Sequence, residues 1–324
     1  MFICIITKQC RAGADTTKIE KIEGSITKFY SADGVELNAF MNRPRGVPSC
    51  KGLAVLHVHG LTGNFFSSTG ITEISKRLAD SGITFMSIET RGSYIVESFK
   101  KGRGKRHSEQ VRGSAFERFE ESVYDIDGAV RFLRRAGFRR IILSGHSSGC
   151  QKAAYYAYKK KCKNVSGIVL MSPVDDYDYD SSYFGKRHAE IVQLAKRIKA
   201  RHGYDALMPR KFANDTPLIS AGRFLSTNDL RNPEARMFNY KGRLEEFSKI
   251  TCPVLAIFGT KDHYEKMDVR KCLKKLSDAS SSSSISTRTI KGAAHNFQGK
   301  RDALALLISA WIKKEFCREK RLMH

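Results

Sequence analysis

The chain has 324 residues, of which 41% are hydrophobic and 28% charged, and its formal net charge is +24 at pH 7. This composition is typical of a globular protein with a sizeable core, and no apolar run approaches the ~20 residues that span a bilayer. The eight cysteines are scattered without a C-x-x-C pair, so we expect neither a disulfide framework nor a zinc site. The basic residues run through most segments without a recognisable nucleic-acid module, so nucleic-acid binding is not expected.

The first elements predicted along the chain are a hairpin and a buried strand. Residues 1–23 match no element and are interpreted as an N-terminal extension. Residues 25–31 and 36–42 flank the turn Ala32-Asp33-Gly34, which predicts an antiparallel pair. Residues 52–59 form an apolar strand that ends at His59-Gly60-Leu61-Thr62-Gly63, and the apolar stripe of the next helix consists of Ile71, Ile74 and Leu78.

A basic segment follows the next strand, at residues 83–89. Because ligands of open α/β sheets bind beyond the carboxyl ends of the strands, we expect this segment near the mouth of the site, where it would favour anionic substrates. A solvated basic loop without a role is the alternative. Gly102 and Gly104 favour a flexible loop, and its cations are Lys100, Lys101, Arg103, Lys105 and Arg106.

The most informative segment joins a strand at 140–144 to a helix at 148–160. An amphipathic helix precedes it, with a stripe from Phe119 to Leu133. At the junction, Gly145-His146-Ser147-Ser148-Gly149 contains G-x-S-x-G, the pattern that exposes a nucleophilic serine on a sharp strand-to-helix turn. We therefore expect Ser147 to be a nucleophile. The oxyanion-hole amides would be those of Leu61, after the earlier strand, and Ser148, at the helix N-terminus.

Residues 175–250 interrupt the alternation of strands and helices. They follow the strand at 165–171 and contain one helix near 187–200 but no convincing strand. A structureless connection of that length is improbable, so we interpret the segment as an inserted helical cap over the site. The acidic run 175–180 lacks an EF-hand pattern, so no metal is expected there. The aromatic residues proposed to line the substrate pocket are Tyr177, Tyr179, Tyr183 and Phe184.

The last strands, at 253–258 and 285–290, each precede a polar motif. Asp262 follows the first in Gly259-Thr260-Lys261-Asp262, and His295 follows the second. The order serine, aspartate, histidine is that of α/β-hydrolases. We expect His295 to act as general base and Asp262 to orient it. Asp175, after another strand, is the alternative acid. A final helix carries Leu304, Leu307, Ile308 and Trp311.

These elements predict an α/β fold with a mostly parallel central sheet flanked by helices. The core would comprise residues 24–174 and 251–317, the cap 175–250, and a tail 318–324. From about Gly24 to Phe316 the chain resembles the α/β-hydrolase superfamily, and within it the small capped serine esterases and lipase-like hydrolases. The resemblance implies the Ser147–Asp262–His295 triad and says little about the substrate.

The expected function is cleavage of carboxylic esters or thioesters through an acyl-enzyme intermediate, without a cofactor. The triad does not separate this activity from that of a peptidase or amidase of the same fold. A non-catalytic binding protein on a hydrolase scaffold is a third possibility, and the intact triad argues against it. The expected partner is a small-molecule ester. The short apolar N-terminal run has no basic n-region, so a cytoplasmic location is expected.

Overall fold

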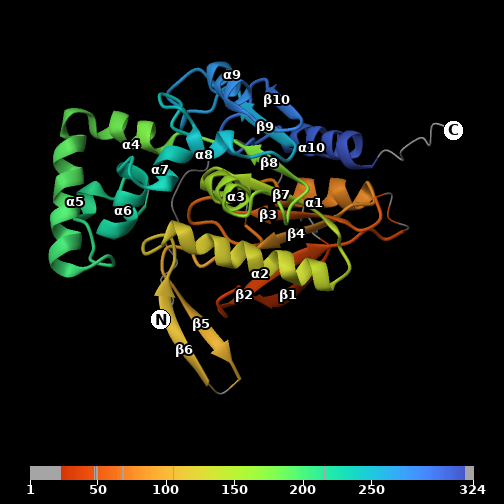
Figure 1. The fold of residues 1–324 in the computed structure, drawn as a ribbon, viewed down its shortest axis with the longest axis horizontal. Coiled ribbons are helices and arrows are strands. Elements are labelled where there is room, and N and C mark those ends of the chain that lie inside the picture. Colours follow the sequence, from red (N-terminus) through yellow and green to blue (C-terminus); the bar gives the residue numbers. More distant parts are fainter. Residues whose placement is uncertain are drawn as a thin grey trace, which may run out of the picture.

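An eight-stranded sheet forms the centre of the molecule (Figure 1). The structure is a computed structural model and describes residues 23–46, 48, 50–67, 69–104, 106–214 and 216–317. The predicted tail and nearly all of the predicted N-terminal extension lie outside these residues. The strands of the sheet, in chain order, are β1 (Ser25–Tyr30), β2 (Glu36–Asn42), β3 (Leu53–Val58), β4 (Thr84–Ile88), β7 (Arg140–His146), β8 (Gly167–Met171), β9 (Val254–Gly259) and β10 (Ile285–Ile290).

The strands lie in the order β1-β2-β4-β3-β7-β8-β9-β10. The predicted N-terminal hairpin is present: β1 pairs antiparallel with β2, and β2 pairs antiparallel with β4. All pairs from β4 to β10 are parallel. Since parallel strands end at one edge, the loops after β3, β7, β9 and β10 meet there.

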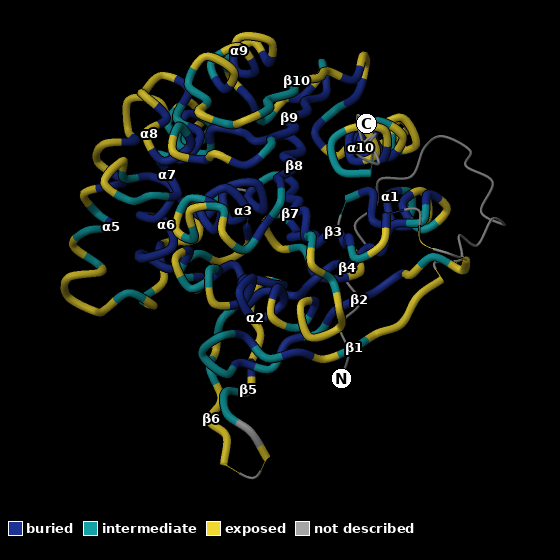
Figure 2. Tube along the Cα trace, turned by 45° about the vertical axis from the view of Figure 1, so that its right-hand side comes forward, coloured by how far each residue is buried: buried dark blue, intermediate teal, exposed yellow. Residues whose placement is uncertain are grey.

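Helices cover both faces of the sheet and account for its continuously apolar strands. Along β3, Ala54 and Leu56 pack into one hydrophobic cluster, with α2, α3 and α9, whereas Leu53 and Val55 pack into the other, with α1 and α10. Figure 2 shows the buried strands between these two layers. The predicted mostly parallel α/β architecture is therefore confirmed. These five helices are α1 (Ile71–Asp80), α2 (Ser122–Arg135), α3 (Ser148–Lys159), α9 (Val269–Ala279) and α10 (Arg301–Phe316).

The basic segment is a hairpin, and the prediction of a flexible loop there was wrong. β5 (Glu97–Arg103) pairs antiparallel with β6 (Arg106–Arg112) and projects from the body of the molecule (Figure 1). Near its own turn, the hairpin contacts the β1–β2 turn, where Gly102 N–H donates to Gly34 O at 2.9 Å and Lys101 Nζ lies 2.9 Å from Asp33 Oδ2. Seven residue pairs satisfy the backbone groups of a segment that sequence polarity alone assigned to a loop. Lys105 and the side chain of Arg103 are not among the parts of the chain that the structure describes.

The segment between β8 and β9 is helical in its described residues. Its first half forms a small cluster of its own that includes Ile191, Phe212 and Phe224. Its second half packs into the main core through Met237 and Phe247, so the separate cluster is smaller than the predicted 175–250 cap. The helices are α4 (Asp176–Phe184), α5 (His188–His202), α6 (Ala221–Asn228), α7 (Pro233–Met237) and α8 (Glu245–Ser248), with short 3₁₀ turns at Gly185–Arg187 and Arg210–Phe212. A further 3₁₀ turn, at Phe119–Glu121, precedes α2.

One cysteine pair departs from the expectation of unpaired cysteines. Cys50, before β3, forms a disulfide with Cys317, after α10, and their Cα atoms lie 5.3 Å apart. The two residues are 267 positions apart in sequence, so only the fold brings them together. No helix among the described residues is long and apolar enough to cross a membrane.

Candidate active site

Ser147 lies on a strained turn between β7 and α3. Its φ is 53° and its ψ −129°, a conformation that L-residues rarely adopt. Close backbone packing explains both glycines of G-x-S-x-G. A Cβ at Gly145 would lie 2.2 Å from Gly149 O, and one at Gly149 would lie 2.4 Å from Val58 O. The two glycines therefore let β7 and α3 approach β3 closely enough to force Ser147 outward.

His295 is paired with Asp262. The Nδ1–H of His295 donates to the carboxylate, whose two oxygens are each 3.0 Å away. Burial alone would raise the pKa of Asp262, but the hydrogen bond and charge of His295 outweigh it and leave the pKa below its usual value. Both side chains are buried. The pairing leaves Nε2 of His295 as the ring nitrogen available for chemistry.

Asp175, the alternative acid, has a structural role. One of its oxygens accepts from Asp178 N at 2.9 Å and caps α4, and the other accepts from Tyr240 N at 3.1 Å. Burial raises the pKa of Asp175 to about 7, and the nearby charges of Glu265 and Asp178 add to this effect. Its carboxylate is thus engaged by backbone amides away from His295.

The loop after β3 lies against Ser147. A Cβ at Gly60 would lie 3.1 Å from Ser147 Cβ, and Leu61 and Ser148 both line the same cavity as Ser147. Within the described chain, neither the Leu61 nor the Ser148 amide donates a backbone hydrogen bond outside helices and strands. Both amides are therefore candidates for the stabilisation of an oxyanion.

Two buried histidines hold these loops in place. His59 Nδ1 donates to Gly60 O at 2.7 Å, and its Nε2 accepts from Ser93 Oγ at 2.8 Å. His146 Nε2 donates to His295 O at 3.0 Å. Burial lowers the pKa of His59 to about 4 and that of His146 to about 3, so both rings are neutral at pH 7.

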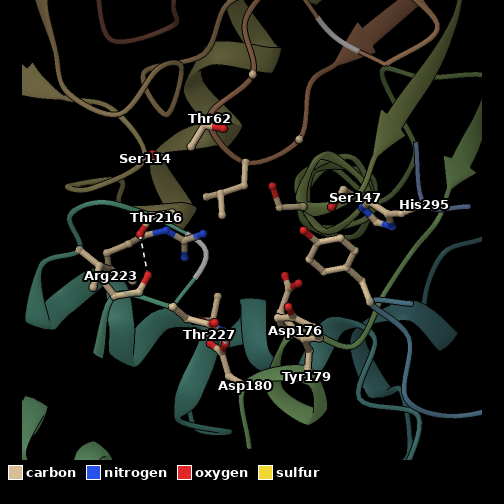
Figure 3. Close-up of a pocket in the computed structure, with 18 of the residues that line it drawn as sticks. Thr62, Ser114, Ser147, Asp176, Tyr179, Asp180, Thr216, Arg223, Thr227 and His295 are labelled. Atoms are coloured by element: carbon tan, nitrogen blue, oxygen red, sulfur yellow. Dashed lines mark hydrogen bonds between the residues drawn. The ribbon is translucent and has the colours of Figure 1, made fainter. Parts of the chain in front are cut away.

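A cavity of about 430 Å³ lies between this edge of the sheet and the helices α4 and α6. Figure 3 shows Ser147 and His295 at one end and Arg223 at the other, with the carboxylate of Asp176 pointing into the space between them. The cavity is thus bounded on one side by the core and on the other by the segment predicted to be a cap.

The four aromatic residues predicted to line a substrate pocket differ in their position relative to this cavity. Tyr179 lines the cavity, whereas Tyr177, Tyr183 and Phe184 do not. Tyr183 is 62% exposed, and Phe184 packs against Phe212 and Phe224 within the cap cluster. The helical period explains the difference, because residues at positions i, i+3 and i+4 share a face. In α4 the residues that line the cavity are Asp176, Tyr179 and Asp180.

Sequence reasoning missed two further parts of the cavity wall. Tyr264 follows Asp262 closely in sequence, and its ring centroid lies 4.5 Å from that of His295, so its sequence position next to Asp262 was an available signal. Arg223 carries no local signal. Its guanidinium pairs with Glu234 at 2.5 Å and lies 3.6 Å from Glu117, residues that are distant in sequence or on other elements.

Comparison with solved structures identifies the architecture. The siderophore hydrolase EstB from Aspergillus fumigatus superposes with a TM-score of 0.68 at 15% identity, covering 91% of this chain and 98% of that one. A monoacylglycerol lipase of Paleococcus ferrophilus superposes with a TM-score of 0.57 at 20% identity, covering 86% and 98%. The predicted α/β-hydrolase fold is therefore confirmed.

Sequence comparison gives two further matches. The model of a family described as "Protein of unknown function (DUF1749)" matches residues 19–313. The UPF0613 protein PB24D3.06c of Schizosaccharomyces pombe is 25% identical over 286 residues, which cover 78% of this chain and 83% of that protein. The match to the family model extends over nearly the whole of the described chain.

Proposed function

The chain belongs to the DUF1749 family, and we propose that it is a serine hydrolase that cleaves carboxylic esters or thioesters through an acyl-enzyme intermediate. The observation that carries the proposal is that His295, which is paired with both oxygens of Asp262, lines the same cavity as the strained Ser147. A strained serine lowers the stability of the fold, and a histidine–carboxylate pair with a purely structural role would not require an open cavity beside it. Their combination is that of an acyl-transfer site.

In the proposed reaction, His295 Nε2 accepts the proton of Ser147 as the serine oxygen bonds to the substrate carbonyl carbon. The carbonyl electrons move onto oxygen, where the Leu61 and Ser148 amides stabilise the charge. The charge of Asp262 stabilises the imidazolium, which then protonates the departing alcohol or thiol. Water, deprotonated by His295, attacks the acyl-enzyme and releases the carboxylic acid and free Ser147.

The experiment uses a fluorophosphonate probe and a series of nitrophenyl esters graded by acyl length. The purified full chain is expected to be labelled at Ser147 and to hydrolyse at least the shorter esters. Ser147→Ala is expected to abolish labelling and to lower turnover roughly 10⁴- to 10⁶-fold. Ser277→Ala, at an exposed position of α9, is the matched control and should behave as wild type. Labelling that survives Ser147→Ala would refute the proposal.

The proposed location is the cytoplasm. The Cys50–Cys317 disulfide bears against it, because glutathione and thioredoxin keep most cytosolic thiols reduced. Alkylation of free thiols in freshly lysed cells, before and after reduction, reports the state of this pair. A fully oxidised pair in cells would favour an oxidising compartment.

A further inference from the structure

Arg223, at the far end of the cavity, belongs to a cluster of buried charged groups. Arg223 pairs with Glu234 and lies near Glu117, and Lys152 Nζ lies 2.6 Å from Glu117. All four side chains are at least 97% buried. Two cations and two carboxylates thus form one cluster, in which the charges of Arg223 and Lys152 are balanced by those of Glu117 and Glu234.

Asp176, by contrast, faces the cavity without a cation. Its Oδ2 accepts from Gln151 Nε2 at 2.7 Å, and no ion pair joins it to any lysine, arginine or histidine of the described chain. Burial raises the pKa of Asp176 well above its usual value, and the charges of Glu234 and Asp180 add to this, against the opposing effect of Arg223. A carboxylate in this setting lacks positive charge.

The space beside Asp176 is bounded by aromatic rings. Tyr179 and Tyr264 both line the cavity, and their ring centroids lie 4.9 Å apart. The ring of Tyr264 also contacts the ring of His295. Aromatic faces attract ammonium groups as well as apolar chains. Lys266 Nζ already lies 4.6 Å from the Tyr179 ring, and it forms no ion pair with Asp176. A substrate chain that leaves Ser147 would thus pass along tyrosine rings toward a carboxylate.

We propose that the preferred substrate is an ester whose acyl or alcohol part carries a protonated amine, held by Asp176. The inference rests on the proposed hydrolase function and specifies its substrate class. It sets aside the anionic preference expected from the basic segment, because none of the described side chains of β5 and β6 lines the cavity. An ammonium group would supply Asp176 with a paired cation, because Arg223, which also lines the cavity, is paired with Glu234.

The test compares esters that differ only in their terminal group. The acyl series consists of 4-nitrophenyl esters of 6-aminohexanoate, heptanoate and hexanedioate, which end in an ammonium, a methyl and a carboxylate. The alcohol series consists of butyrate esters of 5-aminopentanol, hexanol and 5-hydroxypentanoate. In at least one series, kcat/KM of the wild-type protein is expected to be about tenfold or more higher for the ammonium ester than for the methyl ester, and lowest for the carboxylate.

The variant Asp176→Asn keeps the shape of the side chain and its contact with Gln151 but removes the charge. The ratio of kcat/KM for the ammonium ester to that for the methyl ester should fall about ten- to a hundredfold. Asp205→Asn is the matched control, because Asp205 belongs to the same segment, is largely exposed and does not line the cavity. That variant should keep the wild-type ratio.

A measurement on the wild-type protein covers the case in which Asp176→Asn does not fold. Pentylamine should inhibit hydrolysis of the methyl ester competitively, at a concentration at least about tenfold lower than pentanol. The inference is overturned if neither series prefers the ammonium ester, if the ratio survives Asp176→Asn, or if both inhibitors act equally. Hydrolysis through Ser147 without amine preference refutes this inference alone, whereas absence of both hydrolysis and labelling refutes the proposed function and this inference with it.

Discussion

The two walls of the cavity are built in different ways. The core wall consists of loops at the ends of strands, held by close backbone contacts such as those of Gly60 and Gly145. The cap wall consists of side chains on α4 and α6, held by ion pairs such as that of Arg223 with Glu234. The difference suggests a division of roles, in which the core wall performs the chemistry and the cap wall selects the substrate.

The largest effect is expected from the core wall. Asp262→Asn should lower kcat roughly 10⁴-fold with little change in KM, because the amide would favour the wrong tautomer of His295. Steady-state kinetics on a nitrophenyl ester measure this loss. Asp175→Asn is the control: asparagine also caps helices, and this variant should retain most activity. Equal losses in the two variants would show that Asp262 has no special role.

A smaller effect is expected on the cap side. Arg223→Met should lower the free energy of unfolding by about 3–5 kcal/mol, because it leaves the carboxylates of Glu117 and Glu234 buried without their shared cation. Urea titration measures the change. Lys274→Met, which breaks an exposed pair with Asp278, should cost about 0.5 kcal/mol or less. Similar costs for the two variants would mean that the buried cluster does not anchor the cap.

Acid should lower the free energy of unfolding through the buried histidines of the core wall. Burial lowers the pKa of His57 to about 3, as it does for His146, and that of His59 to about 4. The folded state therefore favours their neutral forms. The resulting contribution to the free energy of unfolding is fully present above pH 6.5 and is lost as the pH falls below that value. At pH 5 the loss is about 2 kcal/mol for each histidine.

Asp175 acts in the opposite sense, because its pKa of about 7 makes the folded state more stable as the pH falls from 7 toward 4. Urea unfolding between pH 7 and pH 5 tests both signs. His57→Gln should make the decline in stability shallower, and Asp175→Asn should make it steeper. A change in the other direction for either variant would contradict the assignment for that group.

The smallest effect is expected from the basic hairpin. Replacing Lys100, Lys101 and Arg106 with glutamine should change kcat/KM by about twofold or less for anionic and neutral esters alike, because the hairpin does not line the cavity and exposed charges are screened beyond about 10 Å at 0.1 M salt. Parallel assays of the two esters at low and high salt measure the difference. A selective loss for the anionic ester would restore the preference expected from sequence.

Sequence reasoning succeeded where the signal is local. The strand at 285–290 was predicted with the bounds that β10 has, because an apolar or β-branched run between turns specifies a strand by itself. It failed at the hairpin β5–β6, where charged residues in an exposed pair of strands resemble a loop. On α4, aromatic residues were chosen by type and the helical period was not applied.

The amino-acid sequence by itself determined the parallel sheet, the turn that carries Ser147 and the chain order of Ser147, Asp262 and His295, because each depends on a few consecutive residues. Only the tertiary structure decided that Asp262 and not Asp175 contacts His295, that Cys50 meets Cys317 and that Asp176 faces the cavity without an ion pair to any described residue. These features join segments that lie tens to hundreds of residues apart. Their energies depend on burial and on the distances between charges, which exist only once the chain has folded.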